Sequence, residues 1–314
     1  MDTQSDAVGH EETDAKGHEE TDAKGHEETD AKGNPEGPSI PVPSSYIIDR
    51  PLMTKEDFES DVYNMDHENR GMAIIINNKT FQPHLRLPVR SGTDADSMAL
   101  FSTFNAMGFD VKAYNDMTVQ EMGQILYKAS KEDEYHRQSD CFMCAILSHG
   151  EEGVIYGTDA KTDLQSLLRY FKGNACPGLV GKPKIFFIQA CQGQKFDEGV
   201  ALDVADAKGT MPKEISIKKI PSEADFLLAY SVVPGFYSWR NSRNGSWFIQ
   251  ALTEVLQKSW QSLDLLTILT RVNKKVALDF TSKTSDPTMS NKKQIPMITS
   301  MLTKEIKFKA KQNY

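Results

Sequence analysis

Short apolar runs and amphipathic segments alternate along the chain from about residue 60. Continuous apolar runs, typical of strands buried on both faces, lie at 73–76, 141–147 and 185–188, and further strands are expected at 109–114, 226–233 and 296–302. The segments with helical spacing of apolar residues lie at 91–107, 118–131 and 162–173, and begin again near 246 and 262. This alternation predicts an α/β fold, with a mostly parallel sheet covered by helices on both faces.

Polar residues mark where three of these helices should begin. Thr118, followed by Glu121 three residues later, has the pattern of a capping box. Thr93 or Asp94 is the expected N-cap of the first helix. A further helix is expected to begin at Thr162.

Two stretches lack hydrophobic periodicity, residues 1–49 and 194–221. Residues 9–32 repeat Gly-His-Glu-Glu-Thr-Asp-Ala-Lys three times and have almost no apolar surface, so we expect a disordered tail. A solvated tail is favoured over a metal site in these repeats because nothing fixes a coordination geometry. A long structureless segment inside a compact protein predicts that 194–221 is a functional loop or a linker.

Charge is spread unevenly over the 314 residues. The net charge is −8, but residues 1–49 alone hold 13 acidic and 3 basic side chains, and the remainder is nearly balanced. Charge therefore predicts neither a nucleic-acid nor a membrane partner. With four cysteines and no secretory or membrane-spanning pattern, we expect a cytoplasmic protein with free thiols and no cofactor.

Cys141-Phe-Met-Cys144 has the spacing of a redox or zinc motif. On a strand, however, residues three apart point to opposite faces, so the two sulfurs would not converge. We expect buried structural cysteines here, and no metal site.

A thiol and an imidazole each follow one of the predicted strands. Cys191 comes after the run at 185–188, and His149 after the run at 141–147. If these strands are parallel neighbours, both side chains lie at the same edge of the sheet. A nucleophilic thiol needs such a base, and backbone N–H groups at Gly150 and Cys191 would form an oxyanion hole. A cysteine hydrolase is the leading hypothesis from this placement, but a Cys and a His without further context are more often inert and buried.

The sequence motifs around Cys191 and His149 make the hypothesis of a cysteine hydrolase more specific. Gln189-Ala-Cys-Gln-Gly193, with His149 located 42 residues before the cysteine, resembles the caspase signature. The similarity extends over roughly residues 60–308 and is strongest to the executioner members, types three and seven. Further motifs that resemble those of caspases, and follow in the same order, are Ile74–Asn78, Arg90–Asp94, Leu147–Gly153, Tyr237–Asn241, Gly245–Phe248 and Lys293–Pro296.

The caspase resemblance implies a fold and a catalytic pair. The fold is a caspase-like sandwich around a mostly parallel six-stranded sheet. Cys191 is the implied nucleophile and His149 the general acid/base, with the backbone carbonyl of Pro88 as the third element. A catalytically silent decoy, or a related protease that cuts after Lys or Arg, is the alternative.

The resemblance also implies cleavage after aspartate. Two guanidinium groups and an amide suit a buried substrate carboxylate, and the residues that match are Arg90, Gln189 and Arg240. The backbone of Arg240 would also pair with an extended substrate. The neighbouring subsites are implied to contain Ser238, Trp239, Asn241 and Trp247, with Asn241 facing a P4 aspartate and Trp239 a small apolar P2 residue. A core role is the alternative for both tryptophans.

Two departures from the family pattern affect specificity. Gln192 follows the nucleophile where many relatives have Arg. Lys283 and Ser285 stand where some relatives carry aromatics, so an apolar P5 pocket is not expected, and Lys283 is hypothesised to favour an acidic P4 residue.

The irregular stretches suggest how such an enzyme is activated. Asp203-Val-Ala-Asp206 precedes a small residue inside 194–221, so cleavage is expected after Asp206, with Asp203 and Asp197 as weaker sites. This yields a large subunit, 50–206, and a small subunit, 207–314. The resemblance then implies a homodimer of these pairs, with 296–302 near the twofold axis.

Residues 1–49 resemble a short prodomain. Each repeat places Glu-Glu-Thr-Asp before Ala, which resembles a site for an upstream initiator caspase. Release is expected at Asp14, Asp22 or Asp30, or less favourably at Asp49. The implied partners are protein substrates with exposed Asp-x-x-Asp segments, an initiator caspase and inhibitor-of-apoptosis proteins.

Overall fold

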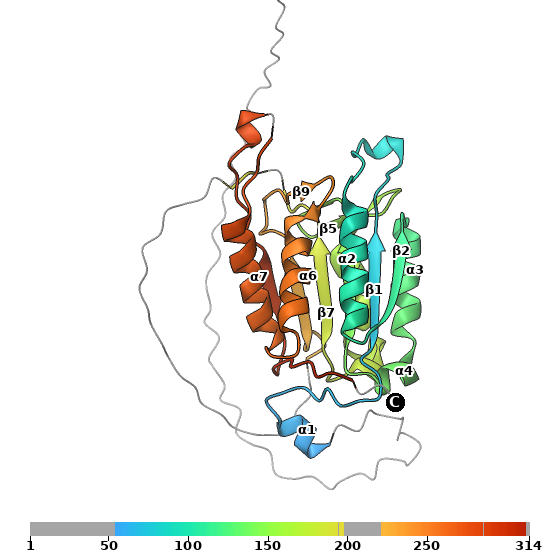
Figure 1. Cartoon of the computed structure of the whole chain (residues 1–314). Coiled ribbons are helices and arrows are strands. Elements are labelled where there is room, and N and C mark those ends of the chain that lie inside the picture. Colours follow the sequence, from blue (N-terminus) through green and yellow to red (C-terminus); the bar gives the residue numbers. More distant parts are fainter. Residues whose placement is uncertain (1–53, 194, 198–220, 285, 312–314) are drawn as a thin grey trace, which may run out of the picture. The chain divides into compact units, whose positions relative to one another are not determined.

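Six strands form the central sheet, in the order β11-β8-β7-β3-β1-β2. The structure is a computed structural model that describes residues 54–193, 195–197, 221–284 and 286–311 (Figure 1). The strands are β1 (Met72–Asn77), β2 (Asp110–Asn115), β3 (Phe142–Leu147), β7 (Lys184–Gln189), β8 (Phe226–Tyr230) and β11 (Met297–Ser300). Neighbouring strands run parallel except β11, which is antiparallel to β8. The predicted mostly parallel six-stranded sheet is confirmed.

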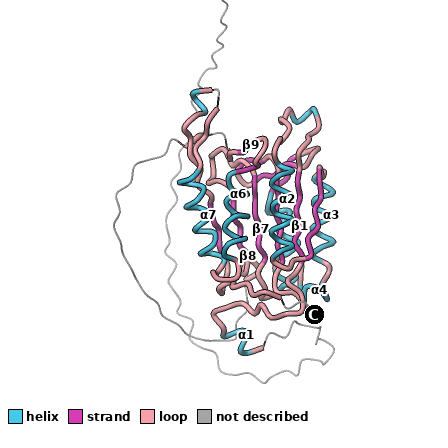
Figure 2. The backbone as a smooth tube through the Cα atoms, in the orientation of Figure 1, coloured by secondary structure: helices cyan, strands magenta, loops and turns pink. Residues whose placement is uncertain are grey.

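Helices cover both faces of this sheet, which explains why its inner strands are continuously apolar. One face packs against α2 (Thr93–Ala106), α6 (Trp247–Ser259) and α7 (Leu265–Asp279), and the other against α3 (Val119–Ser130) and α5 (Leu164–Leu168). Figure 2 shows this helix–sheet–helix arrangement in the backbone alone. The short helices α1 (Lys55–Glu59) and α4 (Asp133–Arg137) complete the set among the described residues, and α1 extends the ordered part slightly before residue 60.

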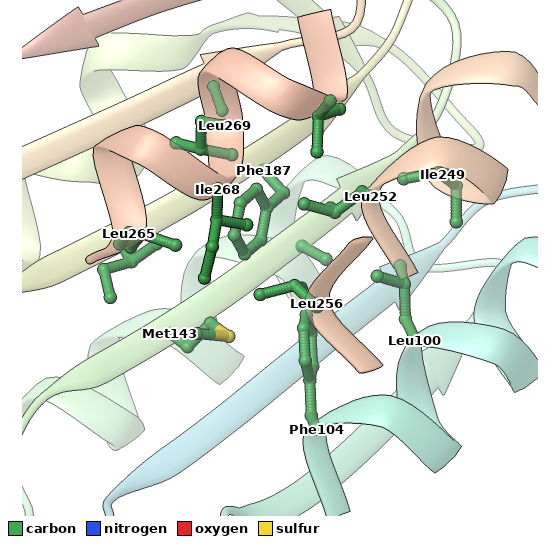
Figure 3. Close-up of a cluster of buried hydrophobic side chains, with 14 of the residues drawn as sticks. Leu100, Phe104, Met143, Phe187, Ile249, Leu252, Leu256, Leu265, Ile268 and Leu269 are labelled. Carbon is green, nitrogen blue, oxygen red and sulfur yellow. The ribbon is translucent and has the colours of Figure 1, made fainter. Parts of the chain in front are cut away.

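Side chains alternate along each inner strand between two separate cores. Ile75 and Phe187 belong to the core under α2, α6 and α7, whereas Ile74 and Phe186 belong to the core under α3 and α5. Figure 3 shows part of the first core, in which Phe187 from the sheet meets Leu252 of α6 and neighbouring side chains.

The capping box at the start of α3 is present as predicted. The Glu121 carboxylate accepts the Thr118 backbone N–H at 2.8 Å, and the Thr118 hydroxyl accepts the Glu121 N–H at 3.2 Å. These reciprocal bonds satisfy two donors that a helix start leaves free.

The predicted cap of α2 is wrong. Gly92 is the N-cap, at φ 88°, with no side-chain cap bond, and Thr93 is the first helical residue. The Thr93 hydroxyl donates instead to Asn77 Oδ1 at 2.7 Å, and Asp94 pairs with a surface lysine. A Cβ on Gly92 would lie 2.2 Å from the Asn241 carbonyl oxygen, so this turn is fixed by a tertiary contact.

The helix expected from Thr162 begins later. Residues 161–163 form β6 (Lys161–Asp163), which pairs with β5 (Val154–Tyr156), and β5 pairs with β4 (Gly150–Glu151). The helix α5 then begins at Leu164, with Asp163 as its N-cap. This small sheet holds the loop after β3.

Cys141 and Cys144 lie on opposite faces of the sheet. Cys141 belongs to the core under α6 and Cys144 to the core under α3, and both are fully buried. The prediction that their sulfurs do not converge is confirmed. Within the described ranges, no cluster of three or more His, Cys, Asp or Glu side chains has the arrangement of a metal site. Within the same ranges, no helix has the length and apolar character to cross a membrane.

Candidate active site

The carboxyl ends of β3 and β7 place His149 and Cys191 in one cavity. Leu147 and Gln189 are register partners in the parallel pair, and the chain continues from them to the two candidate catalytic residues. The cavity measures about 330 Å³. Residues that line it include Pro88, Arg90, Ser148, His149, Gly150, Gln189, Cys191, Gly193, Tyr237, Ser238 and Arg240.

The imidazole of His149 is oriented as a base. Its Nε2 lies 2.8 Å from the carbonyl oxygen of Pro88, and its ring packs against Phe81 with centroids 4.8 Å apart. A carbonyl only accepts, so Nε2 carries the proton and the lone pair of the neutral ring is on Nδ1. Burial, with a smaller effect of Arg90 and Arg240, lowers the pKa of His149 to about 4. The ring is therefore neutral at pH 7.

The pKa of the Cys191 thiol is raised, so the thiol is protonated at pH 7. Burial raises its pKa above the ordinary value, and the Ser238 backbone N–H and the two arginines only partly oppose that shift. A neutral thiol beside a neutral imidazole is the resting state of a general-base mechanism, in which the proton moves during attack.

Two glycines let the backbone pass close to the thiol. A Cβ on Gly150 would lie 2.7 Å from the Val154 carbonyl oxygen and 2.9 Å from the Ala190 Cβ. Gly193, at φ +151°, faces the backbone of Gly235, where a Cβ would lie 2.3 Å from the carbonyl group. Larger residues at either position would push this wall apart.

Arg90 is a buried cation with unused donors. Its side chain is 1% exposed, and its Nη1 donates to the Asn78 carbonyl at 2.9 Å and the Thr93 hydroxyl at 2.8 Å. Among the described residues, its Nε and Nη2 have no hydrogen-bond partner. Burial, together with the nearby Arg240, lowers the pKa of Arg90 to about 9. Unpaired donors on a buried guanidinium are costly unless an anion completes the site.

Gln189 and Arg240 lie beside it. Arg240 belongs to a hairpin of β9 (Arg240–Asn241) and β10 (Gly245–Ser246), and its Nε donates to the Ser91 carbonyl at 2.9 Å. The buried Gln189 donates from Nε2 to Ser238 Oγ at 2.9 Å, and its Oε1 has no partner in the part of the chain that the structure describes. Rotating this amide by 180° would let Oε1 accept from the Ser238 hydroxyl and turn the NH₂ group toward the cavity.

The predicted tryptophans lie beside the cavity rather than in it. Trp239 and Trp247 are 7% and 8% exposed, are stacked with centroids 5.7 Å apart, and belong to the core under α6. The alternative core role therefore describes most of the surface of both tryptophans. Asn241 is exposed, and its Oδ1 accepts two backbone N–H groups of its own turn, which leaves its NH₂ group as a donor.

Phe196 is a neighbour that sequence reasoning missed. Its ring packs against Tyr237 at 5.7 Å and Trp239 at 5.6 Å between centroids. The next residue, Asp197, accepts the Lys293 backbone N–H at 2.9 Å, so this segment is anchored in an isolated bridge. The aromatic Phe196, five residues after the thiol, was the available signal.

The predicted processing sites are mostly outside the described residues. These are Asp14, Asp22, Asp30, Asp49, Asp203 and Asp206, and Ser285 is outside as well. Asp197 is described, and its carbonyl group is held in the bridge to Lys293. Lys283 is described and exposed.

The fold and the cavity together have the form of a cysteine hydrolase, with a thiol, an imidazole and a buried guanidinium in one cavity. The Caspase domain family model matches residues 70–307. The chain is 49% identical over 247 residues to Caspase-7 of Gallus gallus, covering 78% of this chain and 79% of that protein. It is 50% identical over 246 residues to Caspase-3 of Mesocricetus auratus, covering 78% and 86%.

A solved structure agrees with these relatives. The crystal structure of Caspase-1 from Spodoptera frugiperda superimposes with a TM-score of 0.74 at 41% identity, covering 83% of this chain and 98% of that one. The chain therefore belongs to the caspase family and is of the executioner type. It is a cysteine-type endopeptidase.

Proposed function

We propose that this protein cleaves polypeptides after aspartate, at sites of the Asp-x-x-Asp type, and acts as an executioner in apoptosis. The observation that carries the proposal is Arg90, a fully buried guanidinium with two unpartnered donors in the cavity that holds Cys191 and His149. A carboxylate is the planar, doubly accepting anion that such donors fit.

The chemistry follows from the arrangement of the catalytic pair. The Nδ1 atom of His149 takes the proton of Cys191 as the sulfur forms a bond to the substrate carbonyl carbon. Backbone N–H groups of Gly150 and Cys191 stabilise the oxyanion. The amine then leaves with the proton from His149, and water hydrolyses the thioester with the same imidazole as base.

The aspartate pocket and the base are electrostatically coupled. Arg90 and Arg240 both lower the pKa of His149. A substrate carboxylate between the two guanidinium groups would offset their field and raise that pKa, so the imidazole would accept the thiol proton more readily once the aspartate is bound. This coupling favours substrates with the correct P1 residue.

The remaining roles follow the caspase relationship. Gln189 completes the carboxylate pocket, and the backbone of Arg240 pairs with the substrate. Ser238, Trp239, Asn241 and Trp247 line the further subsites, with P2 packing on Trp239 as its aromatic neighbours move. Lys283 favours an acidic P4 residue.

The chain is made as a zymogen in the cytoplasm. An initiator caspase cuts after Asp206, or less readily after Asp203. Cleavage after Asp14, Asp22 or Asp30, or less readily after Asp49, releases the part of the prodomain that precedes the cut. Asp197 is disfavoured because its carbonyl is engaged with Lys293. The active form is a homodimer of large and small subunit pairs, joined near β11, and inhibitor-of-apoptosis proteins are candidate regulators.

One assay separates this function from its alternatives. Purified protein is tested on reporters that end in Asp-Glu-Val-Asp or in arginine, with Cys191→Ala as the control. Hydrolysis of the aspartate reporter alone, absent in Cys191→Ala, is expected. No hydrolysis of either would support a silent decoy, although the intact Cys191, His149 and pocket residues argue against one. Mass spectrometry of the active form should find the chain cut within 195–215, and an intact segment would refute the activation scheme.

A further inference from the structure

Asp96 holds two donors of one residue far away in the sequence. It lies in the first turn of α2 and is 1% exposed. Its Oδ1 accepts the backbone N–H of Ser246 at 2.7 Å, and its Oδ2 accepts the Ser246 hydroxyl at 2.5 Å. Ser246 is fully buried, so water does not compete for these bonds.

These bonds replace a cap that α6 lacks. Ser246 is the N-cap of α6, yet its hydroxyl makes no bond within its own helix. In a capping box, an acid three residues into the helix binds the N-cap N–H, but α6 has Ile249 there. Asp96 supplies the missing carboxylate from α2, and its negative charge suits the positive end of α6.

The backbone fits closely around this carboxylate. A Cβ on Gly245 would lie 2.1 Å from Asp96 Oδ1, so only glycine permits the contact. Where the start of α2 meets the β9–β10 hairpin, a Cβ on Gly92 would likewise clash with the backbone of Asn241. The β9–β10 hairpin and the start of α2 therefore meet with little room to shift.

The contact between Asp96 and Ser246 lies next to Arg90 and Arg240 along the chain and in the hairpin. Ser246 is the register partner of Arg240 in the hairpin, and Arg240 Nε donates to the Ser91 carbonyl at 2.9 Å. The hairpin is thus held at two points against residues 91–96, the stretch that follows Arg90. These contacts determine how the two guanidinium groups sit relative to each other.

Charge supports the same arrangement. Asp96 interacts favourably with both Arg90 and Arg240, which otherwise repel each other. Burial raises the pKa of Asp96 to about 6, so the carboxylate remains ionised at pH 7.

We propose that Asp96 is a positioning residue for substrate recognition, which sets the place of Arg240 relative to Arg90 through Ser246. This inference rests on the proposed function, because it concerns how the aspartate pocket is held. In the cleaved enzyme, Asp96 would belong to the large subunit and Ser246 to the small one, so the contact becomes a non-covalent tie between them.

The test compares two substitutions of the same residue. Asp96→Ala removes both hydrogen bonds. Asp96→Asn removes the charge but keeps an acceptor for the Ser246 N–H, and its NH₂ group can donate to the Ser246 hydroxyl oxygen, so both contacts can persist with the second bond reversed. In Asp96→Ala we expect the KM for the Asp-Glu-Val-Asp reporter to rise about tenfold, with kcat within about threefold of wild type. In Asp96→Asn the KM should stay within about threefold. Asp94→Ala, in the same turn but exposed, is the matched control and should change neither constant.

A second readout distinguishes positioning from general damage. Alkylation of Cys191 by iodoacetamide needs no aspartate pocket, so its rate in Asp96→Ala should stay within about twofold of wild type. An unchanged KM in Asp96→Ala would overturn the proposal, as would alkylation and hydrolysis falling together. If Asp96→Ala does not fold, Ser246→Ala removes one bond alone and should raise KM about threefold, and an unchanged KM there overturns the proposal too.

These outcomes are separate from the fate of the proposed function. Absence of reporter hydrolysis by the wild-type protein would refute cleavage after aspartate. Hydrolysis by wild type, with KM unchanged in the variants, would refute only the role of Asp96.

Discussion

Leu147 of β3 lies opposite Gln189 of β7, and this register brings His149 and Cys191 to one edge of the sheet. The two strands are parallel, so the chain leaves both in the same direction. Burial raises the pKa of Cys191 and lowers that of His149 in this setting. At pH 7 the pair is thus a neutral thiol and a neutral imidazole rather than an ion pair.

The first prediction concerns the pH dependence of thiol reactivity. Because the pKa of Cys191 is raised, the thiolate fraction is small at pH 7 and grows as pH rises. Iodoacetamide should therefore alkylate Cys191 about tenfold faster at pH 8 than at pH 7. The other three cysteines are buried, and Cys191→Ala gives the background. A rate that has already levelled off at pH 7 would indicate a thiolate–imidazolium pair instead.

Arg90 is expected to lower the stability of the free protein while it contributes to substrate binding. Its buried guanidinium has two unpartnered donors, so Arg90→Met is expected to raise the free energy of unfolding by about 1–2 kcal/mol. The same change should lower kcat/KM on the aspartate reporter by about a thousandfold, because a desolvated charge pair with the substrate is lost. Urea unfolding and steady-state kinetics measure the two effects. Loss of stability in Arg90→Met would show that the free donors are not a burden in the free protein.

Phe196 should restrict the P2 residue. Its ring covers Trp239, the proposed P2 contact, so Phe196→Ala would open space there. The ratio of kcat/KM for phenylalanine to that for valine at P2 is expected to rise about tenfold. Phe101→Ala, on an exposed part of α2, is the control. An unchanged ratio would place Phe196 outside the P2 subsite.

Gly150 should tolerate no side chain. In Gly150→Ala the new methyl group would meet the Val154 carbonyl and Ala190, so the wall beside the thiol must shift. We expect kcat to fall at least about a hundredfold, because the proposed oxyanion donors would move with that wall. Gly123→Ala is the comparison, since the Cβ there would lie 3.5 Å from the Tyr170 hydroxyl and a helix interior favours alanine by about 1 kcal/mol. Equal activity of both variants would contradict the role given to Gly150.

Much of the fold was predictable because its strands are long and apolar. β3 has no polar residue, and β7 is apolar from Ile185 to Ile188, which identifies inner strands of a parallel sheet. The strands β4, β5 and β6 have only two or three residues each, too short for any periodicity, so the start of α5 was misplaced.

The candidate site was predictable where its residues stand in short sequence motifs. Cys191, His149 and the pocket residues stand in motifs that carry their order and spacing. The contacts that hold them are long-range and left no local signal. Thr93 looks like a helix cap but its hydroxyl serves Asn77 and Arg90, and Asp96 looks like an ordinary first-turn acid but binds Ser246, 150 residues away.

The most direct measurement compares aspartate with its neutral isostere at P1. Reporters Asp-Glu-Val-Asp and Asp-Glu-Val-Asn differ only in the charge that Arg90, Gln189 and Arg240 are proposed to bind. We predict a kcat/KM at least about a thousandfold higher for the aspartate reporter. With asparagine at P1, the buried charges of a site that binds an anion would stay unpaired. A ratio below about ten would contradict cleavage after aspartate.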